Sequence, residues 1–99
     1  LKGAREAYEL VLKKNPTLTE VRYNLAVLLE STGSREDAEQ ILESLLKDNP
    51  ESEEIWFRLG FLRLERGELQ GAVSAYETCL EKRPDWAEAQ LNLGLAYWR

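Results

Sequence analysis

The three prolines of this 99-residue chain stand at a fixed interval. Pro16, Pro50 and Pro84 are the only prolines present, and each follows the previous one by 34 positions. Other positions keep the same step and hold identical or similar residues: Ala4, Ala38 and Ala72; Leu12, Leu46 and Leu80; Leu25, Leu59 and Leu93; Ala26, Gly60 and Gly94. A fixed period of this length is typical of repeat architectures, in which each unit buries its apolar face only against its neighbours.

Within each unit the apolar residues follow helical spacing. Ile55, Leu59 and Leu62, for example, are separated by four and three positions, which places them on one face of a helix. Gly33 and Gly67 lie midway through two units, where glycine can adopt the left-handed conformation that ends a helix. No stretch shows the alternation of a strand. The sequence therefore predicts six helices, over about residues 1–14, 18–31, 35–48, 52–66, 69–82 and 86–99.

Residues 56–84, with the sequence WFRLGFLRLERGELQGAVSAYETCLEKRP, resemble a tetratricopeptide repeat (TPR). The residues that carry the resemblance are Trp56, Leu59, Gly60, Ala72, Tyr76 and Pro84. Arg63 stands where the family has a tyrosine in its first helix. The last segment, LNLGLAYWR, has Tyr97 at that position, together with Leu93 and Gly94. The resemblance extends over the whole chain.

The resemblance implies an all-α fold, a right-handed superhelical solenoid of antiparallel helix pairs in which helix A of each repeat is followed by helix B. In this frame residues 1–16 are a half repeat (helix B), 17–50 and 51–84 are complete repeats, and 85–99 are a half repeat (helix A). All four segments are expected to form one array. Because the chain has no methionine, even at position 1, we expect it to be an internal segment of a longer protein.

Small residues at fixed positions predict close contacts between helices. Gly60 and Gly94 lack a side chain where helix B is expected to lean on helix A, and Ala72 offers a similar gap from helix B. Tyr76 is the large residue expected to fill the space between neighbouring pairs. Cys79 lies in an apolar helical pattern, so we expect a buried side chain rather than a reactive thiol.

Composition argues against several classes of function. The net charge of -5 and the scattered Lys and Arg residues argue against a nucleic-acid surface. The chain has no histidine, no phosphate-binding loop and no metal-ligand cluster, so we expect no enzyme activity, cofactor or metal. The longest apolar run, residues 25–29, is far shorter than the ~20 residues of a membrane helix. With a single cysteine no internal disulfide can form, which slightly favours the cytoplasm and leaves a periplasmic location open.

The resemblance also implies where a ligand would bind. In this family helices A line the concave face, so helix-A residues outside the packing set are expected to line a peptide- or protein-binding groove. These residues are Tyr23, Asn24, Val27, Phe57, Arg58, Phe61, Leu64, Leu91, Asn92, Leu95 and Trp98. Positions 57, 61 and 64 share one helix face, and positions 91, 95 and 98 repeat that spacing. Such a groove would suit an amphipathic helix or an apolar peptide.

Two functions remain open at this stage. The first is a scaffold that binds a peptide or helix of a partner protein in the groove. The second is self-association, head-to-tail or as a dimer, through the incomplete terminal repeats, since a second copy could supply the missing mate of each terminal helix. The groove could also be covered by another helix of the parent chain.

Overall fold

The structure, a computed structural model, describes Gly3, Glu6, Ala7, Leu10 and residues 19–99. From Thr19 onward this part of the chain contains five α-helices and no strand: α2 (Thr19–Ser31), α3 (Arg35–Asp48), α4 (Glu53–Glu65), α5 (Leu69–Lys82) and α6 (Ala87–Trp98). The predicted all-α fold is confirmed, and the ends of these five helices agree with the prediction to within one residue. The helix predicted over residues 1–14 falls largely outside the described residues. By its internal contacts the chain divides into two units, residues 1–48 and 49–99.

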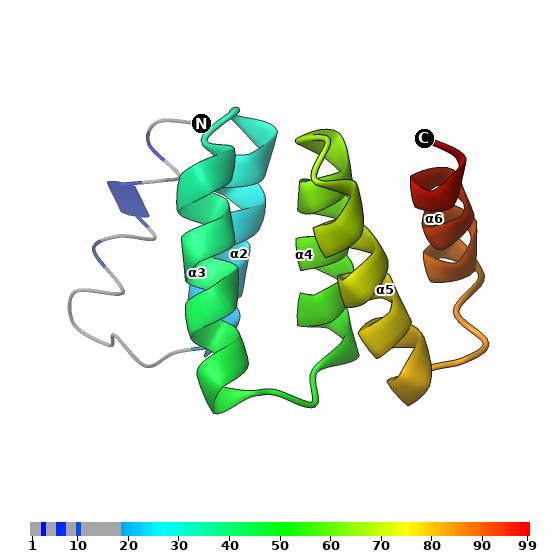
Figure 1. The fold of residues 1–99 in the computed structure, drawn as a ribbon. Coiled ribbons are helices and arrows are strands. Elements are labelled where there is room, and N and C mark those ends of the chain that lie inside the picture. Colours follow the sequence, from blue (N-terminus) through cyan, green and yellow to red (C-terminus); the bar gives the residue numbers. More distant parts are fainter. Residues whose placement is uncertain (1–2, 4–5, 8–9, 11–18) are drawn as a thin grey trace. The chain divides into compact units, whose positions relative to one another are not determined.

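Each helix pair turns at a glycine. Gly33 and Gly67 have φ angles of 91° and 78°, a backbone region that other residues rarely adopt. In the second turn the N–H of Glu68 donates to the carbonyl of Arg63 at 2.8 Å, which closes the turn and satisfies a carbonyl at the end of α4. The same bond occurs 34 residues earlier, at Ser34. The helices of each pair are therefore joined by a short turn and run antiparallel (Figure 1).

The turns after Pro50 and Pro84 share a hydrogen bond made by different side chains. The indole Nε1 of Trp56 donates to the carbonyl of Pro50 at 3.0 Å. One repeat later, the amide Nε2 of Gln90 donates to the carbonyl of Pro84 at 2.7 Å. Both bonds tie the first turn of a helix A to the proline six residues before it. The repeat thus conserves the bond even though the residue type has changed.

The first unit is built on α2 and α3. Its buried side chains come equally from both helices: Leu25, Ala26, Leu29, Ala38, Leu42 and Leu45. Arg22 of α2 donates a hydrogen bond to the hydroxyl of Ser44, and its guanidinium lies 3.7 Å from the carboxylate of Asp48. An apolar seam with a polar connection at one end therefore holds this pair together.

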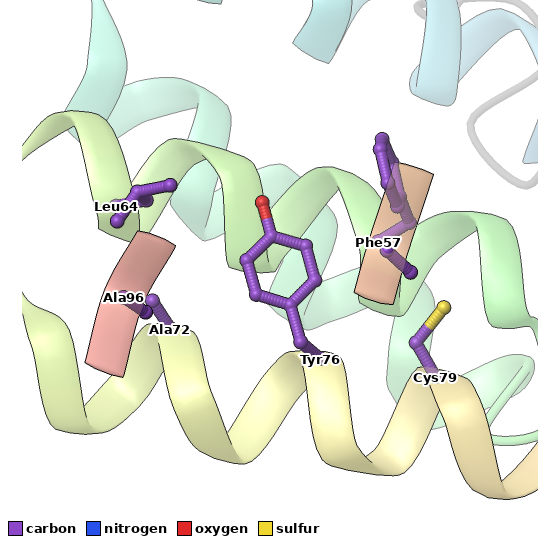
Figure 2. Packing of buried hydrophobic residues seen from close by; sticks show 7 residues of the cluster. Phe57, Leu64, Ala72, Tyr76, Cys79 and Ala96 are labelled. Carbon is purple, nitrogen blue, oxygen red and sulfur yellow. The ribbon is translucent and has the colours of Figure 1, made fainter. Parts of the chain in front are cut away.

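The second unit consists of α4, α5 and α6. One apolar cluster includes buried residues from all three helices: Phe57, Leu64, Ala72, Tyr76, Cys79, Ala89 and Ala96. Figure 2 shows the residues of α5 reaching toward those of α4, with Ala96 of α6 near Leu64 and Ala72. Ala72, Tyr76 and Cys79 have no exposed surface, so the predicted packing roles of these three residues are confirmed.

Candidate binding surface

Gly60 of α4 lets the ring of Tyr76 approach the helix backbone. A Cβ atom added at Gly60 would lie 3.1 Å from each of three Tyr76 ring atoms, closer than carbon atoms normally pack. This contact confirms the predicted reason for a glycine at position 60. At Gly94, the equivalent position of α6, an added Cβ would meet no atom within 4 Å.

Two residues that were predicted to line the groove are instead buried. Phe57 is 8% exposed and Leu64 is 6% exposed. The ring of Phe57 stacks on that of Trp86 at 4.4 Å between centroids, and it meets the edge of Tyr76 at 5.8 Å. This burial corrects the expectation of an open position, because α5, α6 and the turn between them cover this side of α4.

Trp86 is the residue that the sequence reasoning did not place. It precedes α6, and its half-buried indole packs on the apolar cluster. The guanidinium carbon of Arg83 lies 4.6 Å from the centre of the indole ring, a cation–π contact. The signal was present in the sequence, since an aromatic residue stands at position 86 where the preceding repeat has Ser52.

Phe61 and Arg58 remain partly accessible on α4. Both are half-buried, and the guanidinium carbon of Arg58 lies 6.0 Å from the centre of the Phe61 ring. An apolar ring beside a cationic group can contact both the apolar face and the polar backbone or acidic groups of a peptide.

Helix α6 carries most of the exposed apolar side chains. Among the described residues, the large hydrophobic side chains that are exposed are Leu10 and four on α6: Leu91, Leu95, Tyr97 and Trp98. The exposed fractions are 64% for Leu91, 43% for Leu95 and 86% for Trp98. These three residues have the spacing of one helix face, with the half-buried Asn92 beside them. Apolar side chains gathered in this way, rather than scattered singly, mark an interaction surface.

The remaining predicted groove residues belong to α2 in the first unit. Tyr23 and Val27 are half-buried, and Asn24 is exposed. They lie one helical turn or less apart, so α2 offers a smaller surface of mixed character.

The two helices A of the second unit differ in what covers them. Phe57 and Leu64 are buried on α4, whereas Leu91 and Trp98, at the equivalent positions 34 residues later, are exposed on α6. The reason is that α5 packs along α4, while in the described part of the chain no helix takes the corresponding place along α6. The large exposed side chains of α6 therefore occupy packing positions of the repeat that have no cover here.

A hollow of about 390 Å³ lies between α5 and α6. Leu69, Val73 and Ala96 supply much of its apolar lining, and Tyr97 and Glu77 supply polar groups. The Tyr97 hydroxyl donates a hydrogen bond to the Glu77 carboxylate at 3.0 Å, and this bond is the main reason why the pKa of Tyr97 is raised.

The described residues offer little for catalysis or metal binding. No group of three or more His, Cys, Asp or Glu side chains among them could hold a metal ion. Cys79 is buried, and burial raises the pKa of its thiol, which disfavours the reactive thiolate. Among the helices of this part of the chain, none is both long and apolar enough to cross a membrane.

The fold and sequence match proteins that are known by family. The tetratricopeptide repeat model matches residues 1–59, and a TPR repeat model matches residues 62–99. A crystal structure of MamA is 29% identical, with a TM-score of 0.90 over 97% of this chain and 56% of that one. A tetratricopeptide repeat protein from Parabacteroides merdae is 25% identical, with a TM-score of 0.87 over 94% of this chain and 38% of that one.

A third similar structure is that of Naa15/Naa10 bound to HypK-THB, which is 26% identical with a TM-score of 0.77 over 92% of this chain and 14% of that one. The chain thus spans about half the length of the MamA chains that it matches. No curated protein matches the sequence. Since one family model alone covers more than half of the residues, the chain belongs to the tetratricopeptide repeat family.

Proposed function

We propose that this chain is a protein-interaction scaffold that binds a helix or peptide of a partner protein along its helices A. Repeats of this family generally act as protein-interaction scaffolds. The observation that carries the proposal is the exposed apolar face of α6, formed by Leu91, Leu95 and Trp98. Its neighbours Asn92 and, on α4, Arg58 add polar groups that a peptide backbone or an acidic side chain can use.

The chemistry of this face favours an amphipathic helix as the ligand. Leu91, Leu95 and Trp98 present a continuous apolar strip that an extended polar peptide would leave unsatisfied. Tryptophan is enriched among the interface residues that contribute most to binding, and Trp98 has the most surface to lose. The similar Naa15/Naa10 structure contains the further protein HypK, which is consistent with a scaffold role for such repeats.

The proposal is tested by selecting helical peptides from a displayed library on the folded chain and measuring the affinity of those that bind. Trp98→Ala and Leu95→Asp should each weaken binding about tenfold or more, because both remove exposed apolar area. Glu81→Ala, at an exposed position of α5 outside this surface, is the matched control. Substitution of Phe57 is unsuitable because that ring is buried in the core.

The proposal is wrong if binding peptides keep their affinity for the Trp98→Ala and Leu95→Asp chains, provided that circular dichroism shows both variants to be folded. A selection that yields no peptide of measurable affinity would also contradict it.

Self-association is a second candidate function, and the uncovered packing positions of α6 favour it. Gly94 is open where Gly60 is filled by Tyr76, so a second copy could supply a helix there. The other predicted terminal half repeat, residues 1–16, falls mostly on residues outside the described part. A head-to-tail contact would extend into a filament unless it closes. Light scattering over a concentration series tests this candidate, and a monomer at about millimolar concentration would count against it.

A further inference from the structure

We infer that the face of α6 around Gly94 accepts an antiparallel helix with the residue pattern of α5: a small residue, an aromatic residue four positions later, and another small residue three positions after that. In α5 these residues are Ala72, Tyr76 and Cys79. The inference rests on the proposed scaffold function and deepens it, because it names the kind of helix that α6 binds.

The contact between α4 and α5 defines what such a helix must carry. The ring of Tyr76 lies where a Cβ of Gly60 would be, and it meets the edge of Phe57. Ala72 and Cys79, one turn before and about one turn after, have no exposed surface. A larger residue at either position would overpack the pair, whereas a small residue in place of the ring would leave a cavity above the glycine.

Helix α6 repeats the receiving half of this interface. Gly94 stands in the place of Gly60, and Leu91 stands in the place of Phe57. The exposed fraction rises from 8% at Phe57 to 64% at Leu91, and no atom lies within 4 Å of a Cβ added at Gly94. The face of α6 therefore continues the α4–α5 interface by one repeat, and the missing part is the helix that would supply the ring.

The required occupant is a helix rather than an extended segment. The three residues of α5 meet α4 at spacings of four and three, which only a helix brings to one face. An aromatic side chain is needed above Gly94 because a glycine without a cover leaves a gap in the surface of α6. We therefore assign this face to a partner helix with the α5 pattern.

The chain supplies its own probe for the test. A synthetic peptide with the sequence of residues 68–83 carries the pattern, and a covalent link between positions 77 and 81 holds it helical. Both positions are exposed in α5, so the link stays on the outer side. The peptide is titrated into isotope-labelled chain under reducing conditions, and the amide signal of Gly94 and the indole signal of Trp98 are followed by NMR.

We expect saturable shifts at both signals. A peptide with Tyr76→Asp should bind at least tenfold more weakly, since it lacks the ring. Gly94→Leu in the chain should weaken binding of the unchanged peptide by a similar factor without loss of stability, because position 94 has free space in the chain alone. Glu88→Gln, on the same helix but outside this face, should bind as the wild type does.

The inference is overturned if the helical peptide leaves the Gly94 signal unmoved at millimolar concentration, or if Gly94→Leu binds it equally well. Association of the free chain that Gly94→Leu abolishes, and with which the peptide does not compete, would assign the face to a second copy and also overturn it. Library-selected peptides that depend on Trp98 but not on Gly94 would leave the proposed scaffold function standing while this inference fails.

Discussion

A matched pair of glycine-to-alanine substitutions measures the packing that holds α4 and α5 together. Gly60→Ala and Gly94→Ala place the same methyl group at equivalent positions of two helices A. In each helix the change removes the flexibility of glycine, which should stabilise the folded chain by about 0.5–1 kcal/mol. Only the surroundings differ, because the methyl group meets the Tyr76 ring at position 60 and open space at position 94.

The structure sets the expected size of the difference. The new Cβ at position 60 would lie 3.1 Å from three ring atoms, against an optimum of about 3.5–4.0 Å for carbon pairs. Tyr76 has no exposed surface and its ring is flanked by Phe57, so it has little room to retreat. Overpacking of this kind costs about 1–3 kcal/mol. Since the helix term is common to both variants, Gly60→Ala should be less stable than Gly94→Ala by about 1–3 kcal/mol.

Urea unfolding followed by circular dichroism measures both free energies of unfolding. A chain concentration of a few micromolar keeps any association at Gly94 out of the result. In a domain of this size the difference corresponds to a shift in Tm of about 4 °C or more between the variants. If the two variants unfold with free energies that agree within about 0.5 kcal/mol, the ring does not restrict position 60 and the reasoning is refuted.

Two further predictions concern the same core. Trp86→Leu keeps an apolar side chain but removes the stacking on Phe57, so the free energy of unfolding should fall by at least about 0.5–1.5 kcal/mol, measured by urea unfolding; an unchanged value would mean that the stack contributes nothing. Cys79 has its pKa raised by burial, so the unfolded state loses this proton first as pH rises. Its contribution to stability is therefore complete below about pH 8.5 and declines above it, and Cys79→Ala should show a flatter decline in unfolding free energy from about pH 7.5 to 9.5; parallel curves would contradict the assignment.

The helices and their ends could be predicted because their causes are local. The spacing of apolar residues such as Ile55, Leu59 and Leu62 defines a helix face within a few turns. Glycines at positions 33 and 67 end helices through their own backbone freedom, with φ angles of 91° and 78°. The period of 34 residues then identifies which helices are equivalent, and hence the family.

The candidate site was predicted less well, because exposure depends on what packs above a residue. Phe57 and Leu91 occupy equivalent positions and both were assigned to a groove, yet one is 8% exposed and the other 64%. The difference arises from Trp86, whose ring stacks on Phe57 from the turn before α6. No local pattern around position 57 contains that information.

The sequence by itself therefore determined the repeat, the helices, the turns and the small residues at which helices meet. Only the tertiary structure decided which apolar side chains are core and which are surface. Periodicity assigns a residue to a face of its helix, but burial is a property of two elements in contact. Phe57 is core because Trp86 and Tyr76 reach it, and Trp98 is surface because no helix lies against its side of α6 in the described part of the chain.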